Sequence, residues 1–501
     1  MAVFDEGMGL SRLRRVYSLW PFVLATGLGL LIVRLPLLPA VALLAPVVLL
    51  AMFVEPLVGV ALMLLTAPWG ALENVALGRM LLDSGQLLFL LTVGAWLVRS
   101  ALAGRVTLRP MRFTLPLLLF VAVSSFTLID APSIPAGLTE LLKWVEVGVV
   151  ALVVVDRVAI LSRKQTAIAS WIAWPEDSWR VLLFIILLGG FTQAIIGIWQ
   201  FGLRGSGPEH FQIVGGRFFR AYGTFEQPNP FGGFMAWIAC VGLGATLGTT
   251  MQWLFARRSR SRQPLRWLIL LATMTLAAFL ALLFSWSRGA WLGFGSGVAA
   301  LLLLWPRRRF TGLVALLAVL VLAGAIWQSG LLPPAMAERV VSFTEDLQLG
   351  DVRGADINDA NYAVLERLAH WQAALNMARY NLWSGVGFGN YEAAYANYAL
   401  INWPAPLGHA HNYYLNLLAE TGVPGFLAYA LFWFVVVWQT LSVISRSEWP
   451  ERGAALGLLA AWVALSVHQL LDKLYVNNLY LYLGAMLGVL QVLYERTCRK
   501  A

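Results

Sequence analysis

Long stretches of this chain carry no charge, and this feature constrains the fold more than any other. The runs 268–284 and 426–438 are uncharged and mostly apolar. A helix needs roughly 20 such residues to cross the hydrocarbon core of a bilayer, and the runs lack the alternation of polar and apolar residues that marks a membrane β-strand. Charged residues make up only 12% of the chain, about half the share of a soluble domain. We therefore predict an all-α, polytopic transmembrane helical bundle.

The apolar runs predict about fourteen spans, near 18–34, 38–54, 56–72, 84–98, 113–130, 139–157, 180–201, 231–253, 266–284, 289–305, 310–327, 424–444, 453–471 and 478–494. The basic residues agree with this number. If the N-terminus is cytoplasmic, 24 of the 36 lysines and arginines fall in inner loops or the two tails, as the positive-inside rule requires. This places both termini in the cytoplasm. The clustering between spans also favours membrane topology over nucleic-acid binding as the origin of the net charge of +10.

The spans divide the chain into four predicted parts. Residues 1–201 form N-terminal transmembrane helices, 202–327 form transmembrane helices with arginine motifs, and 424–501 form C-terminal transmembrane helices. Between them, 328–423 is an outer loop that is too long for a connector, which is typical of a structured and functional segment. An amphipathic helix is predicted in this loop, with its apolar stripe formed by Val364, Leu368, Trp371, Leu375, Ala378 and Leu382.

Arginines occur at predicted outer membrane edges. Arg217 and Arg220 precede Asn229, which is a candidate helix N-cap, and Arg288 lies in a tight turn between two apolar spans. Free N–H groups at a helix start reinforce arginine in binding an anion. Anchoring of lipid headgroups and snorkelling beside an aromatic belt explain the same residues. Lys143 follows Glu140 in a span, so it forms either an ion pair within the helix or a further phosphate contact.

The segment 408–426 contains the only close pair of histidines, His409 and His411. No second cluster of metal ligands lies at a fixed spacing nearby, so the pair is a poor candidate for a metal site. An imidazole titrates near neutrality and suits a general base, although a lone outward histidine more often has no role. The pair precedes a short helix that Gly422 and Pro424 end. The chain also lacks a P-loop and a dinucleotide fingerprint, so a phosphate-bearing substrate must reach the outer face already activated.

Taken together, these motifs resemble the bacterial O-antigen ligase and O-antigen polymerase superfamily. The matching elements are R-x-x-G-T-F at 220–225 with Asn229, S-R-G-A at 287–290, H-A-H-N at 409–412 and L-A-E-T-G at 418–422. The segment 366–391 resembles the family's loop. The match covers about 205–426, whereas the N-terminal half matches only as a series of membrane helices.

The resemblance implies an inverting glycosyltransferase in a bacterial inner membrane, with its active site at the periplasmic or exterior face. It implies transfer of a glycan from a polyprenyl (undecaprenyl) diphosphate carrier to an acceptor hydroxyl, without metal or other cofactor. The implied general base is His411. The implied diphosphate-binding residues are Arg220 and Arg288, with Arg217 and Lys143 as further candidates, and the supporting residues are His409, Asn412, Glu420 and Asn229.

The acceptor separates several alternatives within the superfamily. Lipid A–core would make the protein an O-antigen ligase, a second lipid-linked repeat unit would make it an O-antigen or exopolysaccharide polymerase, and a protein would make it an O-oligosaccharyltransferase. A lipid flippase or transporter is a more remote alternative. That class of protein predicts inverted repeats and charges at the membrane midplane, whereas the polar motifs here gather at one face.

Overall fold

A computed structural model of the chain describes residues 37–73, 75–77, 80–104, 109–161, 178–255, 263–345, 351–354, 356–357 and 361–500. The described residues are almost entirely helical, as the sequence predicts. Their α-helices are α2 (Leu37–Val54), α3 (Pro56–Thr66), α4 (Ser84–Leu102), α5 (Thr114–Phe126), α6 (Ile134–Leu161), α7 (Ser178–Gly202), α8 (Pro228–Phe255), α9 (Gln263–Phe284), α10 (Arg288–Leu304), α11 (Arg309–Gln328), α12 (Pro334–Glu345), α13 (Tyr362–Tyr380), α14 (Tyr391–Ala394), α15 (Tyr413–Arg446), α16 (Glu451–His468) and α17 (Leu479–Lys500).

Short elements complete the described fold. Three 3₁₀ helices are present, η1 (Ala67–Leu72), η2 (Glu209–Phe211) and η3 (Tyr395–Asn397). Strands β1 (Val75–Leu77) and β2 (Met80–Leu82) form one antiparallel pair, and β3 (Gln212–Ile213) and β4 (Phe218–Phe219) form another. In the second pair Ile213 lies opposite Phe218. Soon after β4, Ala221 donates its backbone N–H to the carbonyl oxygen of Phe284 at 2.8 Å, which places this part of the chain beside the end of α9.

Six described helices are long and apolar enough to cross a membrane, namely α4, α7, α8, α9, α11 and α15. Shorter apolar helices lie in α2, α5, α10 and at 56–72. The last of these was predicted as one span, but α3 ends at Thr66 and a 3₁₀ helix follows. The predicted span 18–34 lies outside the described residues. The protein is therefore a membrane protein with multiple candidate transmembrane helices, and the number of fourteen spans stays a prediction.

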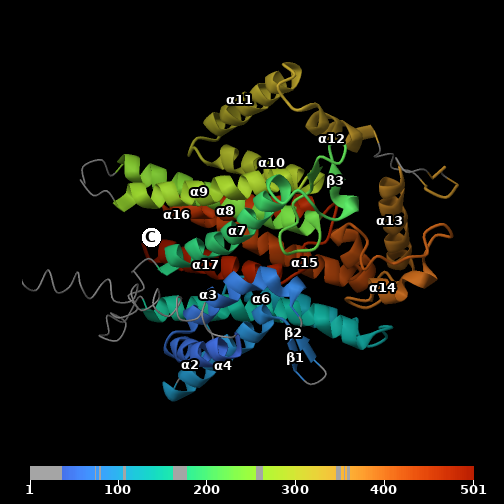
Figure 1. Cartoon of the computed structure of the whole chain (residues 1–501). Coiled ribbons are helices and arrows are strands. Elements are labelled where there is room, and N and C mark those ends of the chain that lie inside the picture. The colour runs from blue at the N-terminus through green and yellow to red at the C-terminus, as the bar shows by residue number, and fades with distance from the viewer. Residues whose placement is uncertain are drawn as a thin grey trace, which may run out of the picture.

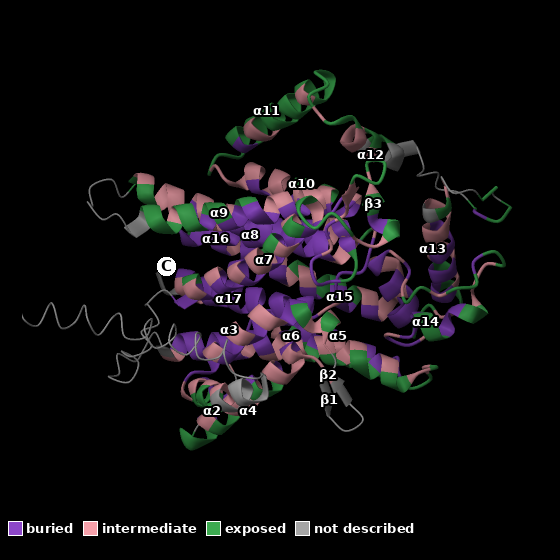
Figure 2. Cartoon of the chain, in the orientation of Figure 1, coloured by how far each residue is buried: buried purple, intermediate pink, exposed green. Residues whose placement is uncertain are grey.

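Helices α8 and α16 lie at the centre of the bundle, where Figure 2 shows mostly buried residues, and α10 packs against both. Glycines make their close packing possible. A Cβ on Gly244 would lie 2.4 Å from the backbone of Gly457, and a Cβ on Gly297 would lie 2.4 Å from the carbonyl oxygen of Ala460. Small residues of this kind let the backbones of membrane helices approach closely. The packing fixes the ends of these three helices relative to one another.

The polar segments gather at one end of the bundle (Figure 1). There α12 of the predicted large loop lies near strand β3, α13 and α14 lie beside α15, and the C-terminus lies at the opposite end. Two helices that are neighbours in the sequence, α10 and α11, differ in their packing. Helix α10 packs against α8 and α16, whereas α11 is only 6% buried over its apolar window. The large loop thus begins from a peripheral helix and returns over the end of the bundle.

Helix α13 confirms that the loop contains a long helix, but its predicted apolar stripe is partly wrong. The most buried side chains are Ala369, Ala373 and Met377, whereas Leu375 is exposed. Helix α13 packs on α15, and its alanines allow a close approach that larger side chains would prevent. The buried face is therefore rotated relative to the stripe of large residues, and it brings His370 into the interior.

Helix α15 is interrupted where the sequence predicts a helix end. Gly422 has φ 63° and ψ −170°, and Pro424 follows it. A Cβ at Gly422 would lie 2.6 Å from the carbonyl oxygen of Leu382, and Val423 donates its backbone N–H to that same oxygen at 2.8 Å. The break therefore attaches the membrane helix to the segment that follows α13. The short first part of α15 carries the residues after the histidine pair.

Candidate active site

A small cavity of about 60 Å³ lies at the polar end of the bundle. Its wall comes from segments that are far apart in the sequence: the chain after β4, the first turns of α8 and α10, helices α12 and α13, and the end of α16 with the residues that follow it. The lining residues are Arg220, Asn229, Ser287, Arg288, Gly289, Arg339, Arg367, His468, Leu471 and Asp472. Four guanidinium groups and one carboxylate give this lining a formal charge of +3 when the histidine is neutral.

Arg220 is held in a fixed orientation. Its Nε donates to the backbone oxygen of Ser285 at 3.0 Å, and one terminal nitrogen donates to Oδ1 of Asn229 at 3.1 Å. Helix α8 begins at Pro228, so Asn229 lies within its first turn and binds Arg220, and the prediction that Asn229 is the N-cap is wrong. Burial, together with the charges of Arg339, Arg367 and Arg288, lowers the pKa of Arg220 to about 9.

Arg288 is the first residue of α10. The turn before it is tight, as predicted, because Trp286 has φ 55° and Ser287 donates its N–H to Oγ of Ser285 at 3.3 Å. The partial positive charge of the helix N-terminus adds to that of the guanidinium group. Arg220 and Arg288 therefore line one cavity, as the sequence predicts, and their role in binding diphosphate stays a prediction.

Arg339 and Arg367 were not singled out from the sequence. Arg339 comes from α12 and Arg367 from α13, so the large loop supplies half of the guanidinium groups in the cavity. Burial, followed by the charges of Arg288 and Arg367, lowers the pKa of Arg339 to about 10. Arg367 lies within the segment 366–391 that resembles the family's loop, which was a usable signal. The sequence around Arg339 gives none.

The loop before α15 places His411 beside this cavity. Leu407, Gly408 and His411 all have positive φ, 49°, 78° and 52°, a conformation that costs free energy in residues other than glycine. The backbone N–H of His411 donates to Nδ1 of His409 at 3.0 Å, and the two rings lie 4.5 Å apart between centroids. Both ring nitrogens of His411 are buried and accept or donate no hydrogen bond among the described residues.

Asp472 links the histidine pair to the arginine cavity. It lines the cavity, and its Oδ1 lies 3.7 Å from Nε2 of His409. One ligand atom from each of His409, His411 and Asp472 falls within 4.8 Å of the others. Asp472 comes after α16, in a segment with no motif, so the sequence did not reveal it. The histidine pair and the arginine-lined cavity therefore meet at this carboxylate.

The histidines of the site are neutral. Burial first, then the charge of His409, lowers the pKa of His411 to about 3, and burial first, then Lys473, lowers the pKa of His409 to about 3. His370 packs near His411 with ring centroids 5.8 Å apart, and burial lowers its pKa to about 4. A neutral imidazole with an unoccupied ring nitrogen is able to accept a proton.

Asp472 also gives the histidine pair a third potential metal ligand, which the sequence spacing did not reveal. Two imidazoles and one carboxylate are a ligand set that Zn²⁺ accepts. The surrounding charge disfavours a cation, because Arg367 lowers the pKa of both His409 and His411 by its positive charge. The expected independence from metal stays a prediction.

Two residues predicted to bind diphosphate do not line the cavity. Arg217 is exposed in the turn between β3 and β4, with its guanidinium carbon 5.4 Å from the centre of the Phe218 ring. Lys143 forms an ion pair with Glu140 at 2.6 Å, which is the intrahelical pair that the sequence allowed. Lys473 binds the same carboxylate at 2.9 Å, so Lys143 belongs to a charge cluster that borders the site through Lys473 but does not line the cavity.

Two predicted supporting residues remain, Asn412 and Glu420, and both have structural partners. Oδ1 of Asn412 accepts hydrogen bonds from the N–H groups of Tyr414 and Leu415 at 3.0 and 3.1 Å, which makes Asn412 the N-cap of α15. Glu420 is buried, and its Oε1 accepts from the N–H of Tyr391 at 3.1 Å. Glu420 therefore holds the segment after α13 against α15 and does not reach the cavity.

The fold and the site define a polytopic membrane protein whose polar groups form one arginine-rich cavity beside a histidine pair, at one end of the bundle. Residues 271–430, about a third of the chain, match the family model described as O-antigen ligase, so this part of the chain is similar to that family. The match includes Arg288, Arg339, Arg367 and the histidine pair, whereas Arg220 and Asp472 lie outside it. No curated protein matches the chain.

Proposed function

We propose that this protein transfers a glycan from a polyprenyl diphosphate carrier to an acceptor hydroxyl at the outer face of the bacterial inner membrane. The observation that carries the proposal is the convergence of Arg220, Arg288, Arg339 and Arg367 on one cavity that adjoins His411 through Asp472. Members of the family generally act on lipid-linked glycans. A cavity of net positive charge at the end of a membrane bundle fits a donor whose diphosphate is attached to a membrane-embedded lipid.

In the proposed reaction the acceptor oxygen attacks the anomeric carbon, and the bond between that carbon and the diphosphate oxygen breaks. The proton of the acceptor hydroxyl moves to a ring nitrogen of His411, and the anomeric centre inverts. The donor carries about two negative charges and the departing lipid diphosphate about three, since a phosphate monoester ionises a second time near pH 6. The arginine side chains are already oriented before the reaction, so they stabilise the growing negative charge without having to move.

The low pKa of His411 is compatible with a general base once the donor is bound. The positive charge of Arg367 contributes to that low pKa, after burial and His409. Two phosphate charges in the cavity oppose the field of the arginines, and a nearby negative charge raises the pKa of an imidazole. Donor binding therefore moves the pKa of His411 toward the operating pH, where general-base catalysis is most effective.

The acceptor is the least constrained part of the proposal. We favour lipid A–core, which makes the protein an O-antigen ligase, over a second lipid-linked repeat unit or a protein. The alternatives share the donor and the site residues, so they differ only in the group that approaches His411. Transport of the lipid is disfavoured, because the described site lies at one end of the bundle and not at the middle of the spans.

The direct test is transfer in vitro from an undecaprenyl diphosphate-linked glycan, with lipid A–core, lipid-linked repeats and protein offered as separate acceptors. Loss of a general base reduces the rate by about 10²- to 10⁴-fold, and we expect this for His411→Ala. His409→Ala should cost less, because His409 acts on the loop of His411 through a hydrogen bond to its backbone. Undiminished transfer by His411→Ala with donor binding intact would refute the assignment of the base.

A further inference from the structure

A second and larger pocket, of about 680 Å³, lies away from the arginine cavity. Its lining residues are Met251, Gln252, Phe255, Trp305, Arg307, Glu448, Trp449 and Arg452. They come from the end of α8, the residues after α10, the residues after α15 and the start of α16. Its volume lies in the range of pockets that bind small molecules.

The pocket and the arginine cavity lie at opposite ends of the same helices. Helix α8 runs from Asn229 at the cavity to Phe255 at the pocket, and its 28 residues span about 42 Å at 1.5 Å per residue. This length is close to the full thickness of a bilayer with its headgroup layers. The pocket therefore lies at the headgroup level of the membrane face opposite to the proposed active site.

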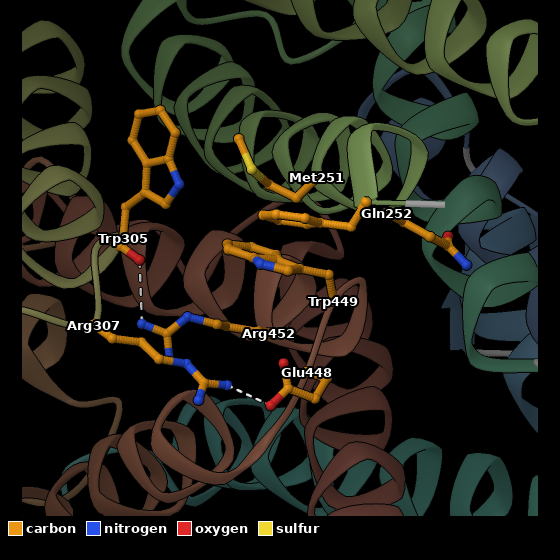
Figure 3. A pocket seen from close by; sticks show the side chains of 8 residues that line it. Met251, Gln252, Trp305, Arg307, Glu448, Trp449 and Arg452 are labelled. Carbon is orange, nitrogen blue, oxygen red and sulfur yellow. Dashed lines mark hydrogen bonds and ion pairs between the residues drawn. The ribbon is translucent and has the colours of Figure 1, made fainter. Parts of the chain in front are cut away.

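The pocket has an apolar side and a charged side (Figure 3). Met251, Trp305 and Trp449 lie on one side, and Arg307, Arg452 and Glu448 lie on the other. Two guanidinium groups and one carboxylate leave a formal charge of +1. Tryptophans at the headgroup level are typical of membrane interfaces. The ligand that fits such a lining has an apolar part next to an anionic group.

The two arginines have different partners. Arg452 is buried and binds backbone oxygens at the ends of two helices, among them Leu304 at 2.8 Å, so it holds the pocket together. Arg307 is 60% exposed and pairs with Glu448 at 2.6 Å, itself 74% exposed. An ion pair that exposed contributes little to stability, so a phosphate is able to replace Glu448 as the partner of Arg307.

We propose that this pocket binds one anionic phospholipid, with its phosphate at Arg307 and its glycerol and upper acyl chain along Trp305 and Trp449. The sequence around the pocket supports an anionic occupant. Arg308 and Arg309 follow Arg307, and Arg446 precedes Glu448, so the membrane face at this end attracts anionic lipids. The proposed lipid site lies outside the site of glycosyl transfer, so the proposal does not depend on the proposed function.

The test is native mass spectrometry of the purified, delipidated protein titrated with phosphatidylglycerol, with phosphatidylcholine and inorganic phosphate as separate arms. We expect one phosphatidylglycerol to bind to the wild type more tightly than phosphatidylcholine. Arg307→Gln should weaken binding about tenfold, the effect of losing one charge-assisted hydrogen bond to the phosphate. The matched control Arg308→Gln, an exposed neighbour outside the lining, should weaken it much less.

Glu448→Gln separates lipid binding from a merely structural ion pair. Removing the competing carboxylate should tighten binding of phosphatidylglycerol. If the pair were purely structural, Glu448→Gln and Arg307→Gln would both change the affinity for phosphatidylglycerol in the same direction. Equal binding of phosphatidylcholine, saturation by inorganic phosphate alone, or equal effects of the Arg307 and Arg308 substitutions would overturn the proposal. So would weaker binding by Glu448→Gln.

Discussion

Nε2 of His409 lies 3.7 Å from Oδ1 of Asp472, while Nδ1 of the same ring accepts the backbone N–H of His411 at 3.0 Å. Because Nδ1 accepts, the proton of the neutral ring is on Nε2, on the side of Asp472. The negative charge of Asp472 favours this tautomer and this orientation of the His409 ring. Through the backbone of the loop, His409 in turn fixes the position of His411.

Asp472→Asn should impair transfer by positioning and not by loss of a reacting group. The amide lacks the negative charge that attracts the Nε2–H of His409, and it can also present a donor, so His409 is oriented less strongly. We expect a fall in kcat of about tenfold with a smaller change in KM for the donor, because misplacement of catalytic groups acts mainly on the reaction step. Asp130→Asn, an exposed aspartate between α5 and α6, is the matched control. A wild-type kcat for Asp472→Asn would remove Asp472 from the mechanism.

Arg367→Gln tests whether the large loop contributes to anion binding. A hydrogen bond to a charged group contributes about 1.5–3 kcal/mol, so loss of Arg367 should reduce kcat/KM for the diphosphate donor by about ten- to a hundredfold. Arg379, on the same helix, is exposed and does not line the cavity, so Arg379→Gln should leave the donor kinetics unchanged. Equal effects of the two substitutions would show that only the overall charge of α13 matters.

The sequence predicted the features of this protein that are local. Apolar runs revealed the helices, and Arg220, Arg288 and His411 lie in motifs whose order along the chain resembles a family. Asp472 and Arg339 were identified only from the structure, because the sequence around them forms no motif that predicts which side chains they contact. The stripe on α13 was mispredicted for a related reason: the helix packs through its alanines, which carry a weak hydrophobic signal.

Lys143 shows a different limit of sequence reasoning. Its alternatives, an ion pair with Glu140 or a phosphate contact, were both compatible with the spacing. The structure shows the ion pair and adds Lys473, which binds the same carboxylate from a segment more than 300 residues away. One carboxylate shared by two lysines depends on tertiary packing, which the sequence around Lys143 does not encode.

Chelation of metal should not affect transfer. His409, His411 and Asp472 could supply three ligands, but the nearby guanidinium groups disfavour a cation at that position. We expect transfer to be unchanged after treatment with EDTA and after addition of Zn²⁺ at equimolar concentration. A loss of activity on chelation that Zn²⁺ restores would show that the three residues form a metal site, and that His411 acts as a ligand rather than as a base.

The neutral histidines make stability depend on pH. The pKa of His370 is lowered to about 4, and those of His409 and His411 to about 3, from about 6.5 in the unfolded chain. Because the folded pKa is the lower one, the unfolded state binds more protons below pH 6.5, and the stability present above that pH is lost as the pH falls. At pH 5 we expect a loss of about 1–2 kcal/mol for each histidine, measured as a falling Tm in detergent. His411→Gln should reduce this slope, whereas His210→Gln, at an exposed position, should not.

Gly422, at the break in α15, should tolerate replacement poorly. Its φ of 63° is unfavourable for alanine, and a Cβ would lie 2.6 Å from the carbonyl oxygen of Leu382 and 2.8 Å from the carbonyl carbon of Trp383. The carbonyl oxygen of Leu382 also accepts the backbone N–H of Val423. A shift that relieved the clash would therefore break this hydrogen bond. Gly422→Ala should therefore destabilise the protein by about 1–3 kcal/mol and displace the histidine loop at the start of α15. Gly324→Ala is the matched control, because nothing lies within 4 Å of a Cβ there and alanine is favoured over glycine inside a helix. A Tm for Gly422→Ala equal to that of Gly324→Ala would show that the break in α15 is not required for the fold.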